Sequence, residues 1–202
     1  GAPLILSADD PHALSMAAAL TARVVTFGFA KGADVHLESS EVLEEGGKAA
    51  GMASHARTAS GSARIMVRGA LGRPQLYAPA AALALSRALG LSDGEALAGL
   101  EKYVPPPGRC RLLIGLNDSL IIDDSYNASP AAVEEALATL KIFPHAKRRI
   151  AVLGDMLELG RYSAEAHKHV GERVAETATM LRTVGFRARQ IAESALDAGM
   201  KD

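Results

Sequence analysis

Three consecutive prolines at residues 105–107 constrain the fold of this chain more than any other feature of its sequence. Proline lacks a backbone N–H and fixes φ, so three in a row cannot continue a helix and favour an extended, stiff connection. The run lies near the middle of 202 residues, a length that suits one large domain or two small ones. We therefore predict a boundary there, with one domain over residues 1–104 and a second over residues 105–202.

The first part begins with the pattern of a βαβ unit. An apolar run at residues 3–7 and a β-rich run at residues 23–29 each predict a strand. Asp10 is placed to cap the helix between them, and Pro11 suits the first helical position, where a missing N–H costs nothing. Two strands joined by a helix predict a parallel pair.

A different pattern follows at residues 33–70, where apolar residues alternate with polar ones and glycines supply turns. It predicts a small antiparallel patch that is solvated on one face. An Ala/Leu-rich helix is expected over residues 77–89. Ser92 and Glu95 have the form of a capping box, which opens another helix that runs to about Tyr103.

The second part alternates strands and helices after an initial β-hairpin, whose turn is expected at Asn117 and Asp118. This order is typical of a Rossmann-like parallel sheet with helices on both faces, so the predicted fold class is α/β. The expected strands are residues 110–114, 119–123, 149–153 and 180–184, and the expected helices are residues 163–177, residues 186–199 and one that starts at Ser129 and Pro130.

The composition excludes several classes of protein. A net charge of −1 and a lack of tryptophan argue against a nucleic-acid-binding protein, which needs cationic and stacking surfaces. No apolar run approaches the ~20 residues that span a bilayer, so no membrane insertion is expected. The single cysteine, Cys110, forbids an internal disulfide and lies in an expected apolar strand, which favours a structural thiol and a reducing compartment. We expect a cytoplasmic monomer.

Neither common nucleotide-phosphate motif is present. The sequence Gly46-Gly47-Lys48 lacks the glycine that a phosphate loop needs five residues before its Gly-Lys pair, and Val42 stands there instead. Ala49 takes the place of the required Ser or Thr. A Gly-x-Gly-x-x-Gly dinucleotide fingerprint is also missing.

Polar groups gather in two loops that follow expected strands. In the first loop, residues 123–130 bring two carboxylates, two hydroxyls, a phenol and an amide to a strand end, directly before a helix N-terminus that attracts anions. Each residue alone is more simply a turn residue, or a cap in the case of Ser129. The whole run holds more polar groups than a turn and a cap require, which favours a binding site.

The second loop, residues 153–160, places Asp155 and Glu158 between two glycines after another strand. A ligand site and a plain turn with solvated carboxylates stay equally open for it. His167 and His169 are two apart and point to different sides of a helix, and the other histidines are isolated, so no metal site is expected. The isolated histidines are His12, His36, His55 and His145.

Taken together, residues 123–130 and 153–160 resemble the Mur ligases of peptidoglycan synthesis. The resemblance is strongest to the members that add the dipeptide D-Ala-D-Ala, because the first motif separates these from relatives that add a single amino acid. It runs from about Leu4 to Gly199. Further agreement comes from residues 7–11, Gly108, Arg109, Glu165, His167, Val170 and Gly171.

The resemblance implies an ATP-dependent amide ligase of three domains. ATP would phosphorylate the carboxylate of a UDP-muramoyl-tripeptide, and the amine of D-Ala-D-Ala would attack the acyl phosphate. The chain would hold the end of the central, ATPase-type α/β domain and most of the C-terminal ligase domain. The phosphate loop and the magnesium ligands would lie upstream, so no metal ligand is expected on this chain and the chain alone would be inactive.

The same resemblance implies roles for six residues. Arg109 would reach the ATP phosphates as the catalytic cation, because a guanidinium suits the charge of a transferring phosphoryl group. Asp124 would bond the ribose, and Tyr126 and Asn127 beside it would contact the nucleotide. The carboxylates expected to face the ammonium group of D-Ala-D-Ala are Asp155 and Glu158.

Two other functions stay open from the sequence. A stand-alone module that binds a nucleotide or a dipeptide without catalysis would need the same loops. A phospho-receiver is a weaker alternative, suggested by the paired Asp123 and Asp124 at a strand end.

Overall fold

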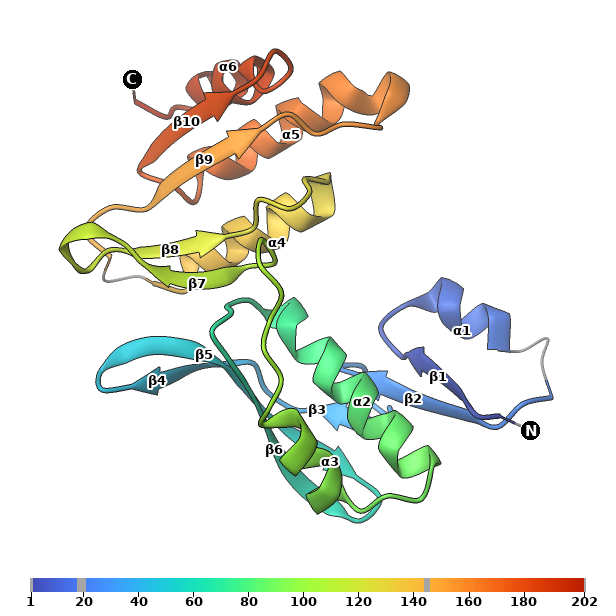
Figure 1. Cartoon of the computed structure of the whole chain (residues 1–202). Coiled ribbons are helices and arrows are strands. Elements are labelled where there is room, and N and C mark those ends of the chain that lie inside the picture. The colour runs from blue at the N-terminus through green and yellow to red at the C-terminus, as the bar shows by residue number, and fades with distance from the viewer. Residues whose placement is uncertain (1, 18–20, 144–145, 202) are drawn as a thin grey trace. The chain divides into compact units, whose positions relative to one another are not determined.

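The chain divides within the proline run into two units, Gly1–Pro106 and Pro107–Asp202 (Figure 1). The computed structural model describes residues 2–17, 21–143 and 146–201, so the isolated His145 lies outside the described residues. Both units combine helices with strands, which confirms the predicted α/β class. The assignment of residues 1–104 and 105–202 to parts of a larger enzyme stays a prediction.

The first unit is built on a six-stranded mixed sheet. Strands β1 to β3 are parallel, and β5 is antiparallel to β3, β4 and β6. The sheet order is β1-β2-β3-β5-β4, and β6 also pairs with β5. The strands are β1 (Leu4–Ser7), β2 (Val24–Gly28), β3 (Val35–Leu37), β4 (Glu41–Glu45), β5 (Lys48–Thr58) and β6 (Gly61–Arg68). The helices are α1 (Pro11–Ala17), the short 3-10 helix η1 (Arg73–Leu76), α2 (Tyr77–Ala88) and α3 (Asp93–Leu100).

The helix caps and the glycine turn predicted for this unit are present in the structure. Asp10 Oδ1 accepts the N–H groups of His12 and Ala13 at the start of α1. Ser92 and Glu95 form the capping box of α3, which ends at Leu100 instead of near Tyr103. The Gly46-Gly47 pair, with φ of 58° and 76°, forms the tight turn between β4 and β5.

The antiparallel strands differ from the prediction in two ways. They continue the main sheet, because β3 pairs with parallel β2 on one edge and with antiparallel β5 on the other. Residues 51–54 of β5 are buried on both faces, where one solvated face was expected, because η1 packs against this strand. The expected alternation of buried and exposed residues is seen in β6 and at residues 54–58 of β5.

The core of the first unit lies between its sheet and α2. Helix α2 packs against β1, β2 and β3 and buries Ala80, Leu83 and Ala84 completely. Ile65 of β6 and Leu76 of η1 are equally buried. Burying a leucine or isoleucine side chain contributes about 2 kcal/mol, so this layer holds the unit together.

The second unit holds two separate two-stranded sheets and three helices. Strands β7 (Arg111–Ile114) and β8 (Leu120–Asp123) form an antiparallel hairpin, and β9 (Ile150–Gly154) and β10 (Met180–Val184) form a parallel pair. The turn η2 (Leu116–Asp118) lies at the predicted place, with left-handed φ at Asn117 and Asp118. The helices are α4 (Pro130–Lys141), α5 (Ser163–Ala175) and α6 (Arg189–Asp197), with the 3-10 turn η3 (Gly160–Tyr162) before α5.

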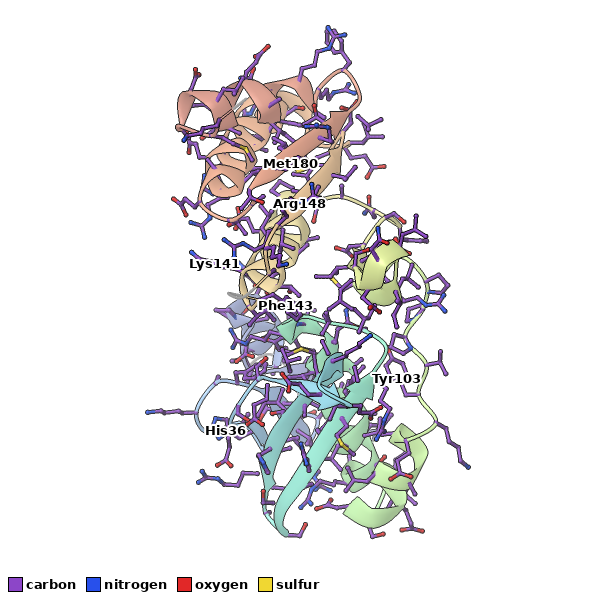
Figure 2. The ribbon with its side chains drawn as sticks, turned by 90° about the vertical axis from the view of Figure 1, so that its left-hand side faces the viewer. His36, Tyr103, Lys141, Phe143, Arg148 and Met180 are labelled. Atoms are coloured by element: carbon purple, nitrogen blue, oxygen red, sulfur yellow. The ribbon has the colours of Figure 1, made fainter. Side chains whose placement is uncertain are left out.

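Two predictions for this unit are wrong. Among the residues that the structure describes, β8 pairs with β7 in the predicted hairpin but no ladder joins it to β9, so parallel pairing in this unit is confined to β9 and β10. The helices also lie on one side of β9 and β10 instead of both (Figures 1 and 2). Gly171 explains the second difference: a Cβ there would lie 2.6 Å from Ser194 Cβ, so the missing side chain lets α6 lie directly against α5.

Candidate functional site

The first loop predicted to carry chemistry is tied to the start of the hairpin. The carbonyl of Gly108 accepts the N–H of Tyr126 at 3.2 Å, and Asp124 Oδ1 accepts the N–H of Cys110 at 3.0 Å. Gly108 has φ of 68°, and a Cβ there would lie 2.9 Å from Tyr126 N. A glycine is therefore required for the two segments to approach. These contacts bring residues 108–110 and 124–126 together at one end of the hairpin.

A cation and an aromatic ring lie together on the surface of this site. The guanidinium carbon of Arg109 lies 4.2 Å from the centroid of the Tyr126 ring. Tyr126 is 72% exposed, so its ring is accessible to a ligand. Cation–π contact restricts the Arg109 side chain and holds its charge beside the loop.

The remaining polar groups of the loop shape its backbone. Asp123 Oδ1 accepts both the hydroxyl and the N–H of Ser125, and these bonds hold the pKa of Asp123 below its usual value. Asn127 Oδ1 accepts the N–H of Ala128. Ser129 Oγ caps α4 through the N–H of Ala132, as predicted. The loop therefore contains turn and cap residues, with Arg109 and Tyr126 projecting from it.

Cys110 differs from the prediction. It precedes β7 instead of lying in it, with a left-handed φ of 50°. Burial, together with the adjacent carboxylate of Asp124, raises the pKa of the Cys110 thiol to about 12. A thiol with so high a pKa carries almost no thiolate at neutral pH, which agrees with the predicted structural role.

The second loop follows β9 and is joined to the loop after β10. Asp155 Oδ1 accepts the N–H of Ala188 at 2.7 Å, directly before α6. Gly185, with φ of 119°, lies under the Asp155 carboxylate, and a Cβ there would overlap it. One oxygen of Asp155 is thus committed to holding the two loops together. Glu158 is exposed, with a left-handed φ of 63°.

A buried histidine on α5 holds the second loop in place. His167 is 1% exposed, and its Nε2 accepts the N–H of Met156 at 3.1 Å. Its Nδ1 lies 2.7 Å from the carbonyl oxygen of Ser163, to which an Nδ1–H tautomer donates. Both ring nitrogens are therefore used within the fold. No role was predicted for His167, although its spacing from Val170, Gly171 and Val174 is that of a buried helix face.

The predicted residues form two groups. Arg109, Asp124 and Tyr126 lie together, with Asn127 adjacent in the chain, while Asp155 and Glu158 belong to the second loop. Within residues 2–17, 21–143 and 146–201, no three His, Cys, Asp or Glu side chains are arranged to hold a metal ion. No helix in the same ranges is long and apolar enough to cross a membrane.

A comparison with protein families decides what this arrangement belongs to. Residues 108–201, which contain both loops, match the family described as Mur ligase, glutamate ligase domain. Residues 108–201 of this chain are a Mur ligase domain. The predicted resemblance to this family is confirmed.

Curated Mur ligases show the same relationship. The chain is 37% identical over 101 residues to the UDP-N-acetylmuramoyl-tripeptide–D-alanyl-D-alanine ligase of Escherichia coli, covering 50% of this chain and 22% of that protein. It is 32% identical over 174 residues to the ligase of that name from Mycobacterium bovis, covering 83% of this chain and 33% of that protein. The chain thus spans a third or less of these relatives.

Solved structures of Mur ligases extend the likeness to both units. MurF from Acinetobacter baumannii matches with a TM-score of 0.79 at 27% identity, over 95% of this chain and 40% of that one. MurF from Thermotoga maritima, solved in complex with ADP, matches with a TM-score of 0.78 at 27% identity, over 94% of this chain and 42% of that one.

Proposed function

We propose that this chain is part of an ATP-dependent ligase that joins D-alanyl-D-alanine to UDP-N-acetylmuramoyl-tripeptide in peptidoglycan synthesis. The observation that carries the proposal is the joined pair of segments 108–110 and 124–126 within a Mur ligase domain. They present a cation, a carboxylate and an exposed aromatic ring in one place. A nucleoside triphosphate offers phosphates, a ribose and a base, which are chemically complementary to these three groups.

Each side chain has a role in the proposal. Arg109 contacts the ATP phosphates and stabilises the charge that develops as the γ-phosphoryl group moves to the tripeptide carboxylate. The second Asp124 oxygen bonds the ribose, and Tyr126 and Asn127 line the nucleotide. The amine of the dipeptide then attacks the acyl phosphate, forms the amide bond and displaces phosphate. Glu158, with Asp155 behind it, faces the ammonium group of the dipeptide.

The proposal also includes a magnesium ion bound with ATP and a cellular location for the ligase. Mg²⁺ would neutralise the phosphates of ATP, held by a part of the enzyme upstream of these residues. The ligase would work in the cytoplasm, since its three substrates are water-soluble or carry a polar nucleotide, and we propose that it does so as a monomer.

Calorimetric titration of the chain with ATP and Mg²⁺ tests the nucleotide site. Arg109→Ala is expected to weaken binding about tenfold, because a charge-assisted contact contributes about 1.5 kcal/mol or more. Asp124→Asn should weaken it less. Arg148→Ala is the matched control, because this arginine is also exposed but lies directly before β9, outside the segments 108–110 and 124–126 (Figure 2). Equal affinity of the Arg109→Ala and Arg148→Ala variants would contradict the phosphate role.

The alternative of a binding module without catalysis makes a different prediction for the longer protein. The chain alone should hydrolyse no ATP under either view, since its sequence contains no phosphate loop. An upstream reading frame with a lysine-bearing phosphate loop, together with ligase turnover of the longer protein, favours the ligase. A gene that encodes only these residues favours the module.

A further inference from the structure

The loops after β9 and β10 form one continuous surface. Neighbouring parallel strands lie about 4.8 Å apart, so the loops at their carboxyl ends meet, and ligands bind at such edges in open α/β sheets. Here the two loops are in direct contact, because Asp155 Oδ1 accepts the N–H of Ala188 and the Asp155 carboxylate packs against Gly185. Each loop therefore limits the movement of the other.

Contacts with the core of the second unit hold the backbone of this surface in place. The Met156 side chain is 1% exposed in the core of the unit, and its N–H is bonded to His167. Leu159 packs against the same core. Only Leu157 and Glu158 of this turn project into solvent. A ligand would thus meet a preformed surface, which lowers the entropy cost of binding.

The loop after β10 adds groups to which no role was assigned from the sequence. Phe186 is 80% exposed, and the Arg189 guanidinium carbon lies 5.6 Å from its ring centroid. Arg187 and Arg189 are exposed, and in the described part of the chain no carboxylate pairs with either. Arginines at the start of a helix are disfavoured by the helix dipole, so they do not serve the stability of α6.

The charges on this surface match a small zwitterion. Glu158 on one loop is an anion, and Arg187 and Arg189 on the other are cations. A dipeptide with unblocked ends carries an ammonium group and a carboxylate about 7 Å apart when extended. It can therefore present its two charges to two different loops that meet at one strand edge. The exposed Phe186 ring offers an apolar surface for methyl side chains.

Resting on the function proposed above, we propose that Arg187 and Arg189 hold the terminal carboxylate of the incoming dipeptide. Glu158 faces its ammonium group, and Phe186 packs against its methyl groups. Asp155 positions the two loops through Ala188 and is not itself the main ammonium ligand. Recognition at both ends would favour a free dipeptide over a longer peptide or a blocked one.

The test is a titration of the 202-residue chain with D-Ala-D-Ala and, separately, with D-Ala-D-Ala amide, which lacks the carboxylate. The double variant R187Q/R189Q is expected to bind the dipeptide about tenfold more weakly, since two charge-assisted contacts are lost. The unmodified chain should discriminate against the amide by a similar factor, and the double variant should bind both ligands alike. Arg173→Gln is the control, because Arg173 pairs with Glu176 at the far end of α5.

Two results would overturn the inference. One is dipeptide binding by the double variant at full strength, and the other is no dipeptide binding by the unmodified chain, since all four side chains lie on it. Neither result bears on Arg109, whose ATP titration tests the proposed function separately. Circular dichroism and the thermal midpoint confirm that each variant remains folded.

Discussion

The two units differ in how many charged and aromatic side chains they leave exposed beside their strand ends. In the first unit, Asp9 accepts three hydrogen bonds, from the N–H groups of Phe29 and Ala30 and from the Tyr77 hydroxyl. Asp93 is likewise bonded, to Arg87 and to the hydroxyls of Thr58 and Ser60. In the second unit, charged and aromatic side chains at the loops after strands project into solvent.

The two units also differ in how far their sheets expose apolar side chains. The sheet of the first unit is covered by α2, whereas Ile150, Val152 and Val184 of the β9–β10 pair are 41%, 67% and 68% exposed. In the first unit Asp9 and Asp93 therefore stabilise the fold, whereas the second unit, besides its bonded Asp124 and Asp155, leaves apolar and aromatic side chains exposed to other molecules. Binding energy is expected from the second unit, and resistance to unfolding from the first.

The substitution with the largest expected effect destabilises the second unit and leaves the stability of the first unchanged. Gly171→Ala places a Cβ 2.6 Å from Ser194 Cβ and against the carbonyl of Ile191, which forces α6 away from α5. Overpacking of this kind costs about 3 kcal/mol. Two-dimensional NMR during urea unfolding should show residues of the second unit unfolding at lower urea, with the first unchanged.

The matched control is the helical glycine Gly99 in α3, where an added Cβ meets nothing within 4 Å. Gly99→Ala should stabilise the first unit by a few tenths to about 1 kcal/mol, through helix propensity alone. Equal effects of the two substitutions would show that α5 and α6 do not pack as described.

A smaller effect concerns the first unit in acid. Burial raises the pKa of Asp9, but the bonds from Phe29, Tyr77 and Ala30 and the nearby Arg73 outweigh it and hold the pKa below 3.8. A lowered pKa contributes stability above the unfolded value, and that stability is lost as pH falls through the folded pKa. The free energy of unfolding of this unit should therefore drop below about pH 4.

Asp9→Asn should reduce this acid dependence and cost about 1 kcal/mol at pH 7. Glu44→Gln, at an exposed position on β4, is the control. Urea unfolding at pH 3 and pH 7 measures both. An acid dependence that is unchanged in Asp9→Asn would mean that other carboxylates cause it.

The substitution with the smallest expected effect is Asp124→Asn, read out through the reactivity of Cys110. Burial, and then the charge of Asp124, raise its pKa to about 12. At pH 8 its reaction with a thiol reagent should be at least about a hundredfold slower than in the urea-unfolded chain. Asp124→Asn should speed it only severalfold, because burial remains. Equal rates in folded and unfolded chain would show that this end of the hairpin is open.

Local features of the fold were predictable because short segments determine them. The caps at Asp10, Ser92 and Ser129 and the hairpin turn at Asn117 depend on residues at most four positions apart. The bounds of β10 agree with the prediction residue for residue. Which strands pair across a unit depends on residues far apart in the chain. There the parallel pair β9–β10 and the hairpin β7–β8 were predicted, but the split into two separate sheets was not.

The candidate site was predictable as clusters of residue types, without their contacts. The family resemblance implied one nucleotide site for Arg109, Asp124 and Tyr126, but the bonds that join residues 108–110 to 124–126 appear only in three dimensions. The commitment of Asp155 to Ala188, 33 residues away, has no local signal. The burial of His167 does have a local signal, which is its spacing from Val170 and Val174 on the buried face of α5.

The most direct test of this division between the units is NMR of the ¹⁵N-labelled chain titrated with ATP and Mg²⁺. The account predicts saturable shifts of the backbone amides at residues 108–110 and 124–127, and their loss in Arg109→Ala. Shifts confined to the first unit, or shifts at the hairpin that persist in Arg109→Ala, would contradict it.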